Sequence, residues 1–187
     1  MPAHVRERAT YEDLLKVPDT MVAELIDGEL FASPRPALPH ADAVTELTST
    51  LRHEHGPRGR GTWHILFEPE LHLGADVLVP DIAGWRTERL PQVPRASAIS
   101  IPPDWICEAL SRSTARMDRE RKLPAYARHG VASAWVVDLD LQYLEVKELR
   151  GGAWTDVATF GGDAKVRTPP FDEIEIDLTL IWGPPPA

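Results

Sequence analysis

The sequence predicts a single α/β domain in which a mixed, twisted β-sheet is flanked by α-helices, with an N-terminal helix and a β-hairpin before it. The 187 residues suffice for one domain with a substantial core. Short β-rich segments alternate with two segments of helical periodicity. The 18 prolines cluster in the connections between these segments. We therefore expect one domain over residues 1–187, with flexible tails at about 1–9 and 183–187.

A short helix and a hairpin are expected at the start of this domain. Thr10 followed by Asp13 resembles a capping box, which opens a helix that Pro18 closes. Asp27 and Gly28 then separate two apolar runs in MVAELIDGELFAS, and this dipeptide tolerates the positive φ angles of a tight primed turn. The pattern predicts two antiparallel strands joined at that turn.

Residues 39–52 predict an amphipathic helix, because apolar side chains recur there at intervals of one, three and four residues. The segments 63–74, 75–85 and 104–110 are β-rich runs that end at Gly, Pro or Ser, and we expect them to form consecutive strands of the mixed sheet. The last run is apolar on both faces apart from Glu108. It should therefore lie centrally and be covered on both sides.

A second helix is expected to begin at a Ser113 or Thr114 cap and to reach about His129, where Gly130 ends it. An exposed strand in the segment after this helix could pair across the two-fold axis of a homodimer, which is the assembly we expect. YLEVKEL is the example we consider for such pairing. The predicted strands of this segment are SAWVVDLD (133–140), YLEVKEL (143–149) and WTDVATF (154–160).

Charge and cysteine content exclude several classes of protein. The 20 Lys and Arg residues against 29 Asp and Glu residues give a net charge of −9, which argues against nonspecific coating of nucleic acid but allows a local basic cleft. Cys107 is the only cysteine, so the chain has no internal disulfide or Cys-rich zinc module, and a reducing cytoplasm fits it. We expect no membrane span and no signal peptide, because no apolar stretch is long enough.

Three acidic residues occupy positions that packing does not explain: Glu24 in AELID, Asp81 after VLVP, and Glu108 in WICEAL. A charge left unpaired in a sheet core is costly, so each must meet a cation, a hydrogen-bond donor, a metal ion or an open strand end. Two carboxylates that converge from neighbouring strands form a site for Mg²⁺ or Mn²⁺, since these hard ions prefer oxygen ligands and keep several waters.

Lys122 falls about two turns into the second predicted helix, where its ammonium could reach back over the strand that carries Glu108. A lysine there could orient a water molecule and offset charge that develops on a phosphate in the transition state. Pro124 removes a helical hydrogen bond two residues later, so we expect a kink, and the direction of Lys122 stays open.

Six short elements follow one another in an order that carries more information than any of them alone. Together they resemble the Uma2-type (DUF820) branch of the PD-(D/E)XK nucleases, over roughly Tyr11 to Trp182. The elements are the ELIDGEL hairpin with Glu24, the PRPALPH segment ending in His40, the VPD element, the E-x-L-S strand, the D-x-x-x-K pair Asp118 and Lys122, and Y-x-x-x-G-V at Tyr126, Gly130 and Val131.

The resemblance implies a restriction-endonuclease-like core that binds a divalent metal, Mg²⁺ or Mn²⁺, through Asp81 and Glu108. Glu24 would contribute a further acidic group, and Lys122 would be the catalytic lysine. In the parent superfamily pattern the lysine lies two residues after the glutamate, where this chain has Leu110. The resemblance to this branch implies that the lysine is displaced onto the neighbouring helix.

Each candidate residue also has a structural explanation. Asp81 could end a strand and accept turn hydrogen bonds, Glu108 could form a buried salt bridge with a helix arginine, and Lys122 could be a solvated helix lysine. Glu24 could pair with a basic residue beside the hairpin. His40 could help to bind metal or phosphate, but its place at the helix start also suits a capping-region residue.

The remaining polar clusters carry less functional information. His53 and His55 lie two residues apart, whereas a helical zinc pair needs about four, so we expect a solvated helix end there. Cys107 should face away from Glu108 as a small buried hydrophobe. The segment after Glu108 could contact phosphates or could be an ordinary charged helix surface with i,i+4 pairs such as Asp118 with Lys122. Its cations are Arg112, Arg116, Arg119, Arg121, Lys122 and Arg128.

The function we expect is Mg²⁺-dependent hydrolysis of phosphodiester bonds in DNA. The first alternative is a noncatalytic DNA-binding or partner-binding module that retains the nuclease fold. The second is a hydrolase that uses the same carboxylates on a small phosphate ester or a sugar. Sequence preference and the choice between single and double strands are not encoded in these motifs.

Overall fold

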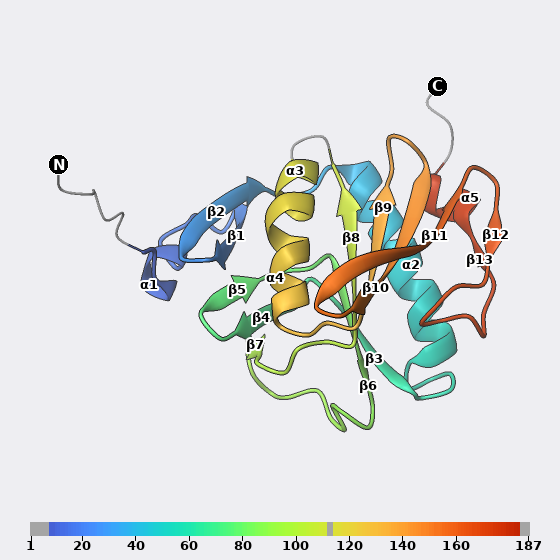
Figure 1. The fold of residues 1–187 in the computed structure, drawn as a ribbon, viewed down its shortest axis with the longest axis horizontal. Helices are drawn as coiled ribbons and strands as arrows, with labels where there is room; N and C mark the ends of the chain where they lie inside the picture. Colours follow the sequence, from blue (N-terminus) through green and yellow to red (C-terminus); the bar gives the residue numbers. More distant parts are fainter. Residues whose placement is uncertain (1–7, 112–113, 184–187) are drawn as a thin grey trace.

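The computed structural model describes residues 8–111 and 114–183, which form two large β-sheets and a two-stranded one, with helices packed on them (Figure 1). The predicted tails fall largely outside these ranges, as does the proposed helix cap Ser113. Within the described ranges, no helix combines the length and the apolar character needed to cross a membrane.

A six-stranded mixed sheet forms the centre of the fold. Its strands β8 and β9 run parallel, and its other neighbouring strands are antiparallel. β8 is buried along its whole length, as the apolar sequence around Glu108 predicted. The spatial order is β11 (Ala153–Gly161), β10 (Tyr143–Arg150), β9 (Ser133–Asp138), β8 (Trp105–Leu110), β6 (Ile82–Arg86) and β3 (Trp63–Phe67).

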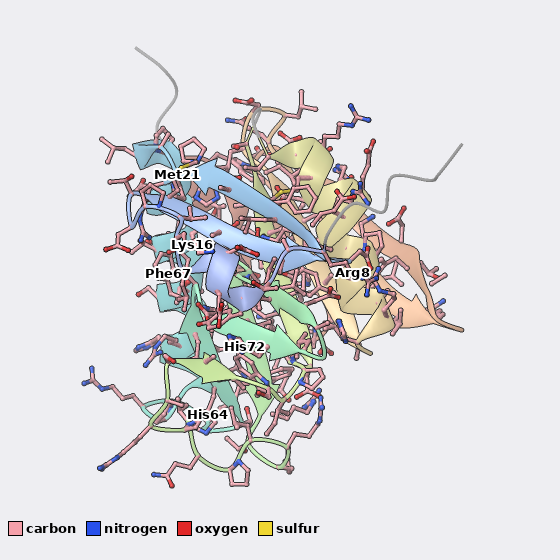
Figure 2. The ribbon with its side chains drawn as sticks, turned by 90° about the vertical axis from the view of Figure 1, so that its left-hand side faces the viewer. Arg8, Lys16, Met21, His64, Phe67 and His72 are labelled. Carbon is pink, nitrogen blue, oxygen red and sulfur yellow. The ribbon has the colours of Figure 1, made fainter. Side chains whose placement is uncertain are left out.

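A five-stranded sheet contains the N-terminal hairpin, and Figure 2 faces this side of the molecule. The predicted hairpin is confirmed, because Asp27 and Gly28 have φ angles of 57° and 80° at its turn. The predicted capping box also forms, between Thr10 and Asp13, at the start of α1 (Tyr11–Leu14). The spatial order is β2 (Glu29–Pro34), β1 (Met21–Ile26), β5 (Asp76–Leu78), β4 (Glu70–Leu73) and β7 (Ala98–Ile99).

The strands between residues 63 and 85 do not all join one sheet, so that prediction is wrong. β3 and β6 belong to the six-stranded sheet, whereas β4 and β5 belong to the five-stranded sheet. Glu68 leaves β3 with a φ angle of 41° ahead of Pro69, and Pro80, which has no N–H, separates β5 from β6. These two connecting segments lie side by side, because the Glu68 N–H donates to the Asp81 carbonyl oxygen at 3.0 Å.

Two hydrophobic clusters cover the two faces of the six-stranded sheet. On β8, Cys107 packs with α2 (Leu38–His55), whereas Ile106 packs with α4 (Leu123–Arg128). Successive side chains of a strand point to opposite faces, so Cys107 faces away from Glu108 as predicted. The cluster under α2 also receives α5 (Leu178–Trp182) and the small sheet of β12 (Lys165–Val166) and β13 (Ile176–Asp177).

Phe171 lies at the centre of an aromatic group within the cluster under α2. Its ring centroid is 4.9 Å from those of Trp63 and Trp105 and 5.5 Å from that of Trp135. The His55 ring packs on Phe171 at 5.1 Å. His55 is therefore buried, and the expectation of a solvated helix end is wrong for this residue because an aromatic side chain covers it.

The predicted second helix is a composite of three segments. These are α3 (Ala115–Met117), a π-turn (Asp118–Lys122) and α4, which Figure 1 shows as one continuous coil. The Leu123 N–H donates to the Asp118 carbonyl oxygen, five residues back, immediately before Pro124. A proline is tolerated in the first turn of a helix, and Pro124 occupies that place in α4.

The C-terminal end of this composite helix agrees with the sequence prediction, whereas the N-terminal end agrees only in part. Thr114 occupies the N-cap position of α3 as predicted, but its side chain makes no capping hydrogen bond. Its hydroxyl instead lies 2.9 Å from the Ser111 hydroxyl. Gly130, with a φ angle of 76°, follows α4 as predicted.

β10 offers no free edge for pairing between subunits. It lies between β9 and β11, and both neighbours bond along its length. The expectation that YLEVKEL could pair across a two-fold axis is therefore wrong, since β11 is the edge strand on that side of the sheet. The homodimer itself stays a prediction.

Asp76 connects the five-stranded sheet to the hairpin turn and to the end of α4. Its carboxylate accepts the Asp27 N–H at 2.9 Å and a guanidinium N–H of Arg128 at 3.1 Å. His129 Nε2 lies 2.8 Å from the same carboxylate. Burial opposes the charged form, but these hydrogen bonds outweigh it and lower the pKa of Asp76 below its usual 3.8.

We expect Asp76→Asn to lower the free energy of unfolding by about 1–3 kcal/mol at neutral pH. Because folding lowers the pKa of Asp76, its contribution is present above the unfolded pKa of about 3.9 and is lost as pH falls through the folded pKa. Urea unfolding between pH 7 and pH 3 should show the gap between the native chain and the variant closing. The exposed Asp42→Asn serves as control, and a gap that is constant with pH would contradict the assignment.

Candidate active site

A cavity of about 220 Å³ lies where β1, the start of β6 and the end of β8 meet α2 and the π-turn. Two acids that the sequence argument did not select for the site, Glu68 and Asp118, also line it. All five residues proposed from the sequence line this cavity: Glu24, His40, Asp81, Glu108 and Lys122.

The Lys122 ammonium lies between the acidic side chains. Its Nζ is 2.9 Å from Glu108 Oε1 and 3.3 Å from Glu24 Oε1. It is 3.8 Å from Asp118 Oδ1 and donates to the Val79 carbonyl oxygen at 2.9 Å. The residue is only 4% exposed, so the alternative of a solvated helix lysine is wrong. Burial disfavours the ammonium, but the surrounding carboxylates outweigh it and raise the pKa of Lys122.

Glu108 is held from two sides inside the cavity. The Tyr126 hydroxyl donates to its Oε1 at 2.7 Å, and Lys122 donates to its Oε2 at 3.0 Å. The alternative of a buried salt bridge is thus partly correct, although the partner is a lysine. Burial raises the pKa of Glu108 well above 4.5, against the lowering effect of Lys122 and with a smaller contribution from Asp81. A carboxylate has about four lone-pair sites, so Glu108 keeps acceptor capacity for a ligand.

Glu24 reaches the same ammonium from the five-stranded sheet. Its Oε1 accepts the Val79 N–H at 2.7 Å, which fixes the carboxylate beside the β5 end. The basic partner that the sequence argument left open is Lys122. Burial is the main reason that the pKa of Glu24 is raised, and the charge of Lys122 counteracts it.

Asp81 is fixed against the end of β8 by two donors. The Ala109 N–H donates to Asp81 Oδ2 at 2.7 Å, and His40 Nε2 lies 3.2 Å from the same oxygen. His40 Nε2 also lies 2.9 Å from the Ala109 carbonyl oxygen. Burial lowers the pKa of His40, but the hydrogen bond and charge of Asp81 outweigh burial, so the net shift is upward.

His40 is therefore a buried part of the cavity wall. The capping interpretation is wrong, because Ala37 occupies the cap position of α2 and no side chain caps it. The second ring nitrogen of His40, Nδ1, is buried and has no hydrogen-bond partner among the described residues.

The cavity contains more carboxylates than cations. Burial raises the pKa values of Glu68 and Asp118, and the charge of Asp81 adds to both shifts. In the described structure, Arg35 lies 3.6 Å from Glu68, and Lys122 lies 3.8 Å from Asp118. A set of oxygen donors with excess negative charge fits a hard divalent cation.

The described ranges contain no group of three or more His, Cys, Asp or Glu side chains arranged to hold a metal ion. A divalent ion here would therefore rest on fewer protein ligands. Mg²⁺ commonly binds in this way, through one or two carboxylates completed by waters and phosphate oxygens.

The basic segment after β8 is largely neutralised by its own ion pairs. Arg112 lies outside the described residues. The i,i+4 pair of Asp118 with Lys122 is buried, so the surface interpretation is wrong for that pair. The arginine pairs are Arg116 with Glu120, Arg119 with Glu145, Arg121 with Glu29, and Arg128 with Asp27 and Asp76.

Sequence reasoning missed three contributors to this cavity. Asp118 and Tyr126 flank Lys122 at four-residue intervals, and this spacing could have placed all three on one helix face. Glu68 carried no such signal, because its place depends on the chain leaving β3 and meeting Asp81.

Comparison with known proteins places the fold in a family. A family model described as "Uma2: Putative restriction endonuclease" matches residues 8–180. The fold is similar to a solved structure described as a putative nuclease belonging to DUF820 from Anabaena variabilis ATCC 29413. The two chains are 24% identical, the alignment covers 92% of this chain and 97% of the other, and the TM-score is 0.75. No curated protein matches the chain. The predicted fold class and family resemblance are thereby confirmed.

Proposed function

Because the chain belongs to the Uma2 family, whose model is described as a putative restriction endonuclease, we propose that it is a metal-dependent endonuclease that hydrolyses phosphodiester bonds in DNA. The observation that supports this proposal is the meeting of Asp81, Glu108 and Lys122 in one cavity. These residues come from a strand start, a buried strand and a helix. Packing alone gives no reason for such convergence.

In this proposal Asp81 and Glu108 are the ligands of Mg²⁺ or Mn²⁺, and Glu24 adds negative charge beside them. A bound divalent ion would polarise the scissile phosphate and make a water molecule more acidic. Lys122 orients the attacking water and offsets the charge that develops on the phosphate. His40 and the Ala109 N–H hold the Asp81 carboxylate in place.

A plasmid-nicking assay tests this proposal. We expect the native chain to convert supercoiled plasmid to open circles with Mg²⁺ or Mn²⁺, and EDTA to prevent the conversion. Mutation of a residue that only hydrogen-bonds to a metal ligand typically lowers metal affinity or activity about 10–100-fold. Loss of a ligand itself should cost no less, so Asp81→Asn and Glu108→Gln should each reduce nicking at least about tenfold. Asp104→Asn removes the same charge outside the cavity and should leave nicking unchanged. Equal nicking by the native chain, Asp81→Asn and Glu108→Gln would remove the site assignment.

A noncatalytic DNA-binding or partner-binding module is the second candidate function. It is favoured by the absence, in the described ranges, of a group of three or more metal-ligating side chains. Calorimetry separates the two candidates. Uptake of Mg²⁺ that Glu108→Gln weakens supports the nuclease, whereas no uptake at millimolar Mg²⁺ supports the binding module.

The proposal includes a cytoplasmic enzyme that acts as a homodimer. Cys107 is the only cysteine and its thiol is buried, so the chain has no internal disulfide that would need an oxidising compartment. This supports a reducing compartment. Light scattering at the concentrations of the nicking assay measures the assembly, and a monomeric mass in an active sample would contradict the dimer.

A further inference from the structure

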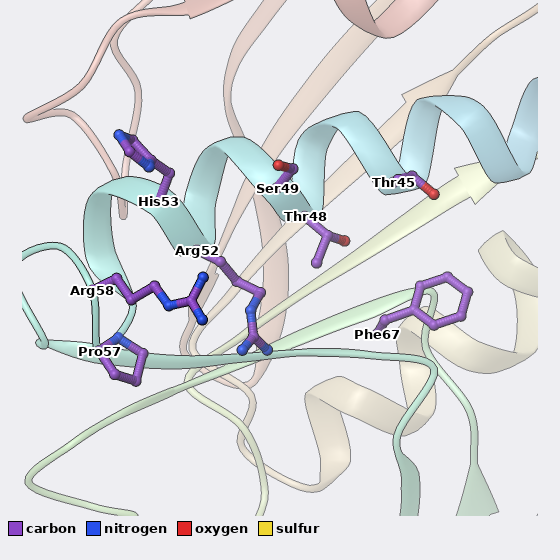
Figure 3. A pocket seen from close by; sticks show the side chains of 8 residues that line it. All are labelled: Thr45, Thr48, Ser49, Arg52, His53, Pro57, Arg58 and Phe67. Carbon is purple, nitrogen blue, oxygen red and sulfur yellow. The ribbon is translucent and has the colours of Figure 1, made fainter.

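A second concave surface lies along α2, on the flank next to the edge strand β3. It has a volume of about 590 Å³, and we call it the α2–β3 groove. Figure 3 shows Arg52 and Arg58 directed into the space between the helix and the strand that ends at Phe67. Within the described ranges, no Asp or Glu lines it. The lining residues are Thr45, Thr48, Ser49, Arg52, His53, Pro57, Arg58 and Phe67.

The two arginines of the groove differ from most cations of this acidic chain. Arg119 and Arg128, for example, each make ion pairs with carboxylates. Arg52 donates one N–H to the Ile65 carbonyl oxygen at 2.8 Å and makes no ion pair with a described residue. Arg58 likewise has no carboxylate partner in the described ranges. Guanidinium groups that keep free donors in a concave surface suit phosphate oxygens.

Phe67 places an exposed aromatic ring at the end of the groove next to the candidate active site. The residue is 51% exposed, and Figure 2 labels it on the opposite side of the view from the helix α4. In the strand register Phe67 pairs with Ile82, the residue after Asp81. The next residue, Glu68, lines the active-site cavity. An exposed aromatic face is a stacking platform for an unpaired base.

The groove and the cavity both include residues of α2, so one extended strand could reach both. His40 lies in the cavity wall, and Arg52 lies twelve positions further along the same helix, which is about 18 Å at about 1.5 Å per residue. Phosphates of one strand are spaced about 3.4 Å along a duplex axis, so this length corresponds to about five nucleotides in duplex geometry and to fewer in an extended single strand.

We propose that the α2–β3 groove binds one strand of the DNA whose backbone lies in the active-site cavity, with Arg52 and Arg58 on its phosphates and Phe67 stacked on an unpaired base. This inference rests on the proposed nuclease function, because it assigns that substrate a path. It predicts that the protein prefers DNA with an unpaired segment, since the faces of a paired base are covered by its neighbours in the duplex.

Fluorescence anisotropy with a labelled 20-nucleotide DNA strand, in EDTA so that no cutting occurs, tests the path. Arg52→Gln with Arg58→Gln should weaken binding about tenfold or more and reduce the slope of log affinity against log salt by about 1.4, the value for two phosphate contacts on a single strand. Phe67→Leu should weaken binding of the single strand about tenfold. It should change binding of the matching duplex less.

The control is Arg89→Gln with Arg150→Gln, which removes the same charge from two arginines that make ion pairs elsewhere. An equal loss with this control, or an unchanged salt slope in the groove variant, would overturn the inference. The nicking assay separates the two proposals. If the native chain nicks DNA in a metal-dependent way and the groove variants bind DNA normally, the groove proposal is rejected and the nuclease proposal stands. If the groove variants show the predicted binding changes but the native chain does not nick DNA, the nuclease proposal is rejected and the groove stands as a DNA-binding surface.

Discussion

Lys122→Met should abolish nicking and destabilise the fold in the same variant. Its ammonium lies within 3.3 Å of Glu24 and of Glu108, and its removal leaves both carboxylates buried without a cation. Breaking a buried ion pair by removing one partner typically costs about 3–5 kcal/mol, which is the loss in unfolding free energy that we expect. Loss of one group that stabilises transition-state charge typically costs about 10²–10³ in rate.

A double variant separates the structural role of Lys122 from its proposed catalytic role. Adding Glu108→Gln to Lys122→Met removes an uncompensated charge and should restore part of the lost stability, as urea unfolding measures. Nicking should stay absent in both variants. Lys16→Met, which changes a lysine with a 72% exposed side chain, should alter neither property. Nicking by folded Lys122→Met at the native rate would show that this lysine has no part in the chemistry.

Phe171→Ala should strongly destabilise the fold by opening a cavity in the core. The side chain is fully buried between Trp63, Trp105 and Trp135, and it also covers His55. Truncation of a buried phenylalanine leaves a cavity and typically costs about 3–5 kcal/mol. Urea unfolding measures this loss directly. The matched control is Phe67→Ala, since the same truncation at an exposed ring should change the unfolding free energy by less than about 0.5 kcal/mol. Equal effects at the two positions would contradict the aromatic core.

Local signals in the sequence were sufficient for most elements of the fold. The capping box at Thr10, the Asp27-Gly28 turn and the apolar stripe of α2 depend on neighbours in the chain, and each formed as predicted. The division into two sheets could not be read in this way. It depends on pairing between strands far apart in the sequence, and the chain passes between the two sheets at Glu68 and at Pro80.

The candidate site was found from the sequence because buried strands rarely contain carboxylates, so Glu24 and Glu108 stood out. Their neighbours were harder to predict. The orientation of Lys122 depends on the π-turn before Pro124, and a periodicity of 3.6 residues does not anticipate that turn. Glu68 could be placed only from the tertiary structure.

The division of the acids between two sheets has a consequence for folding. Glu108 belongs to the six-stranded sheet and Glu24 to the five-stranded one, and they share a single ammonium. A chain that has built only the larger sheet therefore has Glu108 but lacks Glu24 next to that lysine. Incompletely folded molecules cannot assemble the full acidic pocket, so the proposed nuclease activity would depend on docking of the N-terminal hairpin.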